Sequence, residues 1–162
     1  MKKYKIVLIC ANLVIVLMFF HYSVYQKEAI LTKGQLVLLR LAPVDPRSLM
    51  QGDYMDLRYD ISRNDSDISK SSSGYLVVQL DSGNVARMVR LQDKATPRAT
   101  GEYLIKYSRR AYRDVRIGAE SYFFEEGQGS KYDSAAYGGL RIDDRGNSVL
   151  TGLYDSHKQL IQ

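Results

Sequence analysis

The first apolar positions of the chain form one run from Ile6 to Tyr25. Twenty helical residues at about 1.5 Å each extend about 30 Å, the thickness of one bilayer core. Asn12 is the one strongly polar residue before His21. An isolated amide in such a helix is either simply tolerated or hydrogen-bonded to another helix. The run predicts a transmembrane helix over residues 6–25.

A cleaved signal peptide is the competing interpretation of this run. Its apolar part would be about 7–15 residues long and would precede a small-x-small cleavage site. No such site occurs before Lys27, and Tyr22 and Tyr25 suit the headgroup level of an uncleaved helix. Three lysines precede the run: Lys2, Lys3 and Lys5. By the positive-inside rule they favour a signal-anchor with a cytoplasmic N-terminus over residues 1–5.

After a juxtamembrane linker over 26–33, period-two alternation replaces the continuous apolar run. In Tyr54–Ile61, for example, Leu57 and Tyr59 share an apolar face, whereas Asp56 and Arg58 occupy a charged one. Strands or strand pairs are expected at Gln35–Leu41, Tyr54–Ile61, Tyr75–Asp81, Val85–Gln92, Glu102–Tyr107, Tyr112–Ile117, Ser121–Phe124 and Ile142–Leu153. This spacing predicts a mainly β domain over 34–155, an antiparallel barrel or sandwich, followed by a tail over 156–162.

Glycine-containing turns and short polar stretches separate these strands. Ser82–Asn84 and Asp144–Asn147 have the composition of hairpin turns. Arg63–Gly74, rich in Ser, Asp and Asn, predicts a mobile loop. Two stretches indicate short helices, Asp45–Gln51 and Ser130–Tyr137.

The net charge of +5 comes from 23 basic and 18 acidic residues. Without the three N-terminal lysines, 20 basic residues face 18 acidic ones, so most of the excess belongs to the topology signal. The single cysteine, Cys10, lies in the apolar run and cannot form an internal disulfide. With two histidines besides, the chain offers little for a soft-metal site, and we expect no metal or cofactor.

The sequence contains no convincing catalytic constellation, and we expect a protein that is not an enzyme. The alternative is a Ser/Lys hydrolase distantly similar to signal peptidase, with Ser48 as nucleophile and a desolvated Lys106 as base. His21 and His157 lie outside the β domain, which leaves no candidate for a His-containing triad. Asp143–Asn147 could be a calcium loop, but it has too few oxygen ligands and is better explained as a turn.

A basic cluster interleaved with tyrosines lies in the second half of the domain. Its members are Lys106, Arg109, Arg110, Arg113 and Arg116. Such a cluster can bind lipid headgroups, glycans or nucleic acid, although an extracytoplasmic location disfavours nucleic acid. The alternative is a solvated connection whose charges serve solubility.

The densest motif runs from Ala42 to Tyr59. Asp45 before Pro46 suits a helix start, and Gly52 suits its end. The strand entry Gly52-Asp53-Tyr54-Met55-Asp56-Leu57-Arg58-Tyr59 matches every fixed position of the GDYXXLXY pattern, so the chain resembles that family of uncharacterised membrane-anchored bacterial proteins. Further on, Arg116–Gly127 resembles the family's second block, and Tyr137–Ile142 and Val149–Leu153 resemble its closing strands.

The resemblance implies an inner-membrane anchor and a periplasmic domain in a Gram-negative bacterium. It also implies a multi-spanning membrane protein encoded nearby, and no known activity. We therefore expect an accessory or interaction module for such a partner, the alternative being an envelope glycan- or lipid-binding barrel. The residues expected to matter are Asp45, Arg47, Gly52, Asp53, Tyr54, Leu57 and Tyr59. Of these, Leu57 and Tyr59 should pack inside, whereas Asp45, Arg47, Asp53 and Tyr54 should serve contacts or a polar network.

Overall fold

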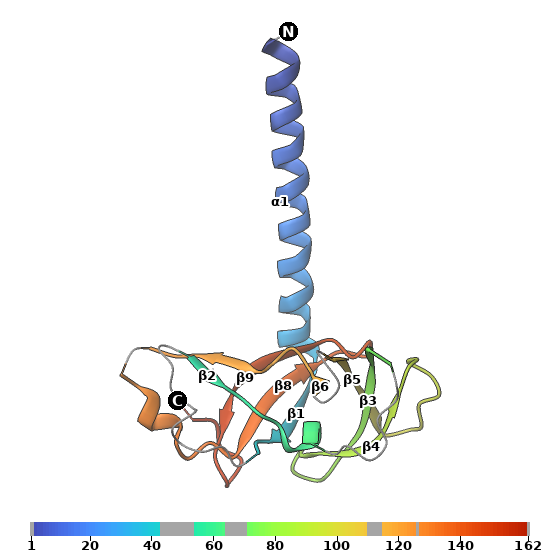
Figure 1. Cartoon of the computed structure of the whole chain (residues 1–162), viewed down its shortest axis with the longest axis vertical. Helices are drawn as coiled ribbons and strands as arrows, with labels where there is room; N and C mark the ends of the chain where they lie inside the picture. The colour runs from blue at the N-terminus through green and yellow to red at the C-terminus, as the bar shows by residue number, and fades with distance from the viewer. Residues whose placement is uncertain (1, 43–53, 64–70, 110–114, 126, 162) are drawn as a thin grey trace.

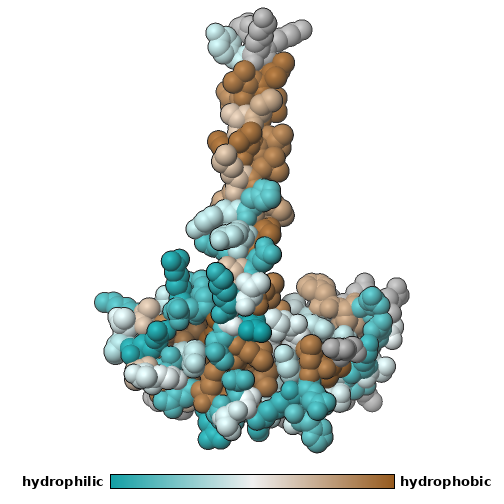
Figure 2. Space-filling model, turned by 180° about the vertical axis from the view of Figure 1, so that it is seen from behind, coloured by the Kyte–Doolittle hydropathy of each residue, from teal (hydrophilic) through white to brown (hydrophobic). Residues whose placement is uncertain are grey.

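The computed structural model describes residues 2–42, 54–63, 71–109, 115–125 and 127–161 (Figure 1). A single long helix, α1 (Lys2–Lys33), rises from one side of a β domain. Its segment Tyr4–Lys33 is long and apolar enough to cross a membrane, and none of its most apolar stretch is buried in the protein. The exposed apolar surface covers the outer part of the helix, and polar residues gather where it meets the domain (Figure 2).

The helix does not end at Tyr25, because residues 26–33 are its last turns rather than an extended linker. Ile30 is buried against the domain, which holds this segment in place. The helix ends at Gly34, whose backbone N–H donates to the Ile30 carbonyl at 2.8 Å. An added Cβ at Gly34 would collide with that carbonyl and lie 2.9 Å from the Ile142 carbonyl, so the tight exit requires glycine.

Three antiparallel sheets make up the described part of the domain. One has the order β1 (Gln35–Arg40), β8 (Tyr137–Ile142), β9 (Ser148–Tyr154). The largest has the order β4 (Ala86–Gln92), β3 (Ser73–Leu80), β5 (Glu102–Arg109), β6 (Val115–Arg116). The third pairs β2 (Tyr54–Asp56) with β7 (Ser121–Phe123).

The sheets share one hydrophobic core in a sandwich-like arrangement, and no closed barrel forms among the described strands. Val37 and Leu140 come from the first sheet and Val78 and Ile105 from the second, and all four are fully buried. Backbone hydrogen bonds join the first two sheets. The Leu38 N–H donates to the Asn84 carbonyl, and the Lys106 N–H donates to the Gly146 carbonyl, both at 2.8 Å.

Several further expected elements differ from the structure; the hairpin expected over 142–153, for example, has its first strand at Tyr137–Ile142. Only Tyr54–Asp56 of the predicted strand 54–61 is paired, because the chain makes an isolated bridge at Tyr59 and then a 3₁₀ turn, η2 (Asp60–Arg63). The predicted helix over 130–137 is the 3₁₀ turn η4 (Gly129–Tyr132), after which the chain enters β8. The predicted helix over 45–51 lies outside the described residues.

Candidate functional site

The second half of the sequence motif packs in the domain core and forms hydrogen bonds to a distant segment of the chain. Leu57 and Tyr59 are 2% and 1% exposed, as the alternation predicts, while Asp56 and Arg58 are exposed on the other face. The Leu57 N–H donates to the Glu120 carbonyl at 2.6 Å. The Tyr59 hydroxyl donates to the Ala119 carbonyl at 2.6 Å.

Tyr59 also fits against β8. An added Cβ at Gly138 would lie 2.8 Å from the Tyr59 ring, so only glycine lets the ring approach this strand so closely. Burial raises the pKa of the Tyr59 phenol, and the nearby Glu120 carboxylate raises it further, so the phenol stays a proton donor. Glu120 itself accepts hydrogen bonds from the Ile117 and Gly118 backbone N–H groups at 2.5 and 3.2 Å.

Three separated blocks of the sequence therefore meet around one tyrosine ring: the motif strand, residues 117–120 and the start of β8. These are the blocks whose composition resembles the GDYXXLXY family. A family model described as GDYXXLXY protein matches residues 16–153, most of the chain. The chain belongs to the GDYXXLXY family. Comparisons with curated proteins and with solved structures gave no match.

The first half of the motif cannot be placed in this GDYXXLXY protein. Asp45, Arg47, Gly52 and Asp53 lie outside the described residues, as does Ser48 of the hydrolase hypothesis. The backbone of Tyr54 lies in β2, opposite Phe123 of β7. The expected contact or polar network of these residues stays a prediction.

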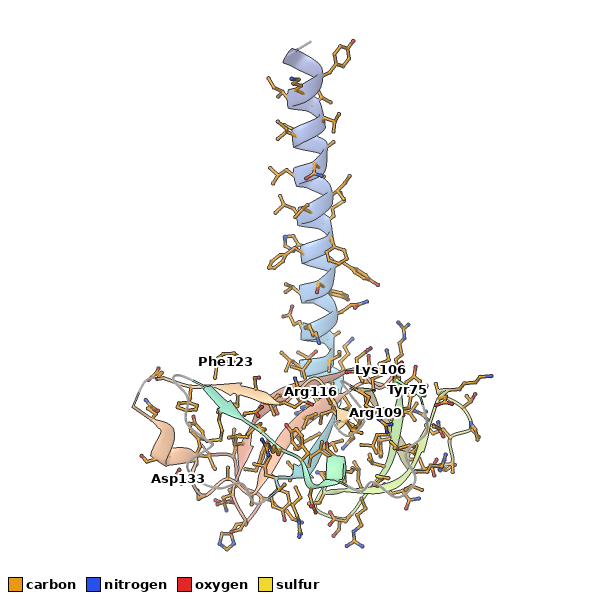
Figure 3. The ribbon with its side chains drawn as sticks, in the orientation of Figure 1. Tyr75, Lys106, Arg109, Arg116, Phe123 and Asp133 are labelled. Carbon is orange, nitrogen blue, oxygen red and sulfur yellow. The ribbon has the colours of Figure 1, made fainter. Side chains whose placement is uncertain are left out.

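The basic cluster is spread over β5 and β6 in the described part of the chain. Lys106 is exposed, and its Nζ donates to Asn147 Oδ1 at 2.7 Å. This lysine therefore lacks the burial that a hydrolase base would require. Arg116 is also exposed, on β6 (Figure 3). Arg110 and Arg113 lie outside the described residues.

Arg109, at the end of β5, has unused hydrogen-bonding capacity. Its Nε and one terminal nitrogen are buried without a partner among the described residues, as are the Tyr107 hydroxyl and Gln92 Nε2. Burial raises the pKa of the Tyr107 phenol. Among the described residues, Arg109 thus has guanidinium donors available to an acceptor.

The junction between α1 and the domain is tightly connected. Besides the buried Ile30, one guanidinium nitrogen of Arg141 in β8 donates to the Gly34 carbonyl at 2.7 Å. Gly34 leads directly into β1, the edge strand that pairs with β8. The helix and the first sheet consequently form one continuous unit.

Sequence reasoning did not identify an ion pair in the large sheet between a half-buried arginine and a buried glutamate. Glu102, 7% exposed, accepts hydrogen bonds from both terminal nitrogens of Arg90 at 2.6 and 2.8 Å and from the Ala99 N–H at 2.9 Å. Arg90 also donates to the Pro97 carbonyl at 3.0 Å. These hydrogen bonds stabilise the connection between β4 and β5. Nothing in the alternation distinguishes Glu102 from an exposed strand residue.

The remaining sequence candidates are accounted for locally. Asp143 Oδ1 accepts the N–H groups of Arg145 and Asn147 at 3.0 and 2.8 Å, and Oδ2 accepts the Asn147 side-chain amide at 2.7 Å. The carboxylate therefore shapes the β8–β9 turn. His157 is exposed in the C-terminal tail, and its backbone N–H donates to Asp155.

Proposed function

We propose that this GDYXXLXY protein is a non-enzymatic accessory module that docks a multi-spanning protein of the same membrane. In this proposal α1 is an uncleaved anchor in a bacterial inner membrane, with the N-terminus in the cytoplasm and the β domain in the periplasm. The lysines at 2, 3 and 5 support this orientation by the positive-inside rule. The family resemblance supports the kind of partner.

The observation that carries the proposal is the direct connection of α1 to the domain. Ile30, Gly34 and Arg141 fix the helix on the first sheet, so no flexible linker separates the anchor from the domain. The domain then presents one defined side to the membrane surface. A fixed orientation of the domain lets α1 contact a partner within the membrane while the domain contacts the same partner outside it.

The surface of α1 gives this neighbour a place to bind. None of the other described residues covers the apolar part of the helix, and Asn12 is exposed within it. An amide in the bilayer core gains from a hydrogen bond to another helix, typically about 0.6–2 kcal/mol. Asn12 therefore marks the face on which we expect a partner helix.

Photocrosslinking in intact membranes tests this proposal. Val16 lies one helical turn from Asn12 on the same face, whereas Val14 lies on the opposite face. A photocrosslinking residue at position 16 of the full-length chain should capture a multi-spanning membrane protein, and the same residue at position 14 should not. The variant Asn12→Leu should reduce the capture from position 16 by about threefold or more.

The same experiment has results that would count against the proposal. Equal yields from positions 14 and 16, or adducts with lipid alone at both, would contradict the docking proposal. The Asn12→Leu comparison separates a specific helix contact from simple crowding, because this change leaves the apolar length of α1 intact.

A further inference from the structure

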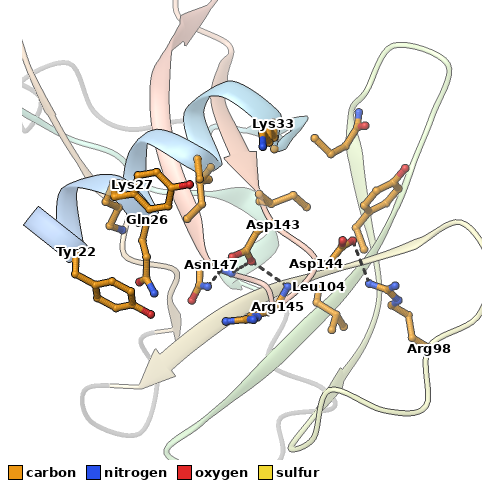
Figure 4. Close-up of a pocket in the computed structure, with 17 residues that line it drawn as sticks. Tyr22, Gln26, Lys27, Lys33, Arg98, Leu104, Asp143, Asp144, Arg145 and Asn147 are labelled. Atoms are coloured by element: carbon orange, nitrogen blue, oxygen red, sulfur yellow. Dashed lines mark hydrogen bonds and ion pairs between the residues drawn. The ribbon is translucent and has the colours of Figure 1, made fainter.

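A cavity of about 760 Å³ lies between α1 and the domain, at the base of the helix (Figure 4). Its other walls are the β8–β9 turn, the connection before β5 and the start of β5. This volume is within the range of small-molecule sites, about 300–1,000 Å³. None of the motif residues that the structure describes lines it.

One face of α1 forms the helical wall. Tyr22, Gln26, Ala29 and Lys33 all line the cavity and follow one another at intervals of four, three and four residues. Residues at these intervals lie on the same side of a helix. The cavity is therefore a result of how α1 is seated, with Ile30 buried beside it.

The lining carries more positive than negative charge. Its cations are Lys27, Lys33, Arg98 and Arg145, and its carboxylates are Asp143 and Asp144. Asp143 is engaged in the β8–β9 turn, and Asp144 lies 3.9 Å from Arg98. In the described part of the chain, no carboxylate pairs with Lys27, Lys33 or Arg145.

A further cation lies beside the cavity. Lys106 donates to Asn147, which is part of the lining, so the basic cluster on β5 continues the positive surface. Its labelled position in Figure 3 is on the side of the domain from which α1 rises. The cavity and this lysine form one positively charged region around the base of the helix.

The cavity begins in the headgroup layer and extends beyond it: Lys27 lies within the layer, and Lys33 lies past its outer edge with a long side chain that can reach back toward the membrane. If the apolar run ends at Tyr25, Lys27 lies about 3 Å and Lys33 about 12 Å further along the helix axis. The headgroup layer on each side of a bilayer core is about 5–8 Å thick. Tyr22 and Tyr25, also in the lining, are the aromatic type that concentrates at this level.

We infer that the cavity binds the phosphate-bearing headgroup of an anionic phospholipid from the membrane that α1 spans. The phosphodiester lies among Lys33, Arg145 and Lys27, and the acyl chains run along the apolar surface of α1. The bound lipid fills the space between helix and domain and fixes the domain on a negatively charged surface. This inference rests on α1 being a membrane anchor, as the proposed function has it.

Lipid retention by the full-length protein tests the inference. The protein is reconstituted in nanodiscs containing equal amounts of phosphatidylglycerol and phosphatidylcholine, and the lipids that stay bound after release are counted by native mass spectrometry. The wild type should retain phosphatidylglycerol preferentially. The double variant Lys33→Gln/Arg145→Gln should lose this preference by about fivefold for each removed charge.

A matched control removes the same charge elsewhere. Arg87 and Lys131 are exposed and do not line the cavity. The variant Arg87→Gln/Lys131→Gln should therefore retain phosphatidylglycerol as the wild type does. Equal retention of both lipids by the wild type, or an equal loss in the control variant, would overturn the inference.

A free phosphate ion is the other ligand whose phosphate group these cations would bind. Inorganic phosphate added to the detergent-solubilised protein should not displace phosphatidylglycerol, and displacement dependent on Lys33 and Arg145 would assign the site to a soluble phosphate instead. Crosslinking from Val16, measured in the Lys33→Gln/Arg145→Gln variant, keeps the two proposals apart. Capture that persists in this variant while its lipid preference is lost supports both proposals, whereas capture by a wild type that shows no lipid preference would remove the lipid site and leave the docking function standing.

Discussion

The Tyr59 hydroxyl donates to a backbone carbonyl 60 residues further along the chain, and its ring packs against the start of β8. One side chain thus joins the motif strand, the segment before β7 and the first sheet. This explains the L-x-Y end of the motif as a requirement of the fold, since neither Leu57 nor Tyr59 is accessible to a ligand.

Replacing Tyr59 by Phe should lower the free energy of unfolding by about 1–3 kcal/mol, because the buried Ala119 carbonyl loses its donor. Urea unfolding of the full-length protein in detergent, followed by tyrosine fluorescence, measures this. Tyr154→Phe is the matched control, since the hydroxyl of this half-buried residue has no hydrogen bond in the described part of the chain. Equal losses in the two variants would contradict the role of the Tyr59 hydroxyl.

Glu102 should make the stability depend on pH. Hydrogen bonds from the Arg90 guanidinium, followed by the one from the Ala99 N–H, lower the pKa of its carboxyl from 4.5 to about 2. The unfolded chain takes up this proton near pH 4.5, but the folded chain does so only near pH 2. The contribution to stability is therefore complete above about pH 4.5 and is lost as the pH falls towards 2.

The variant Glu102→Gln should consequently show a flatter decline of the unfolding midpoint between pH 4.5 and 2. Asp133→Asn, at an exposed position, is the comparison that removes a carboxylate without this pair. If Glu102→Gln keeps the full decline of the wild type, the ion pair does not control the acid sensitivity of the domain.

At the scale of elements, four of the strands and the turns beside them could be predicted from the sequence. The ends of four strands, β1, β3, β4 and β5, lie within two residues of the expected positions. Each strand is bounded by glycine or polar residues, and between these boundaries its residues either alternate between apolar and polar or are continuously apolar. The turn at 82–84 is shaped by Asp81, whose Oδ1 accepts the Gly83 and Val85 N–H groups at 2.7 and 3.0 Å. Such turns are encoded within a few residues.

The central strand β8 could not be found by alternation. Its first four residues, Tyr137 to Leu140, are all buried, because β1 and β9 flank the strand and packing covers both of its faces. Two of them are glycines, which carry no hydropathy signal. The register that places Gly138 under Tyr59 is a tertiary requirement that only the folded chain reveals.

The candidate site was predictable to a smaller extent than the fold. The basic cluster was visible in the sequence, but the cavity at the base of α1 was not. Its cations come from positions 27, 33, 98 and 145, which no local pattern connects. They meet only because the helix continues to Lys33 and is seated on β8.

At the scale of the molecule, the charge has two separate uses. In our proposals the N-terminal lysines set the orientation of α1, and the cations around its base hold an anionic lipid. The lipid site and the docking of a partner both require that the helix and the domain move as one body. A domain swinging on a flexible tether would present no constant side to a partner or to the membrane.

The distance between α1 and the domain tests this requirement directly. Spin labels are attached at Ser23→Cys in α1 and Lys94→Cys in the domain, in a Cys10→Ser background. Double electron–electron resonance in nanodiscs then measures the distribution of distances between the two labels. A Gly/Ser insertion after Lys33 supplies the flexible reference. We predict one narrow distance in the full-length protein, and a distribution as broad as that of the insertion variant would contradict the account.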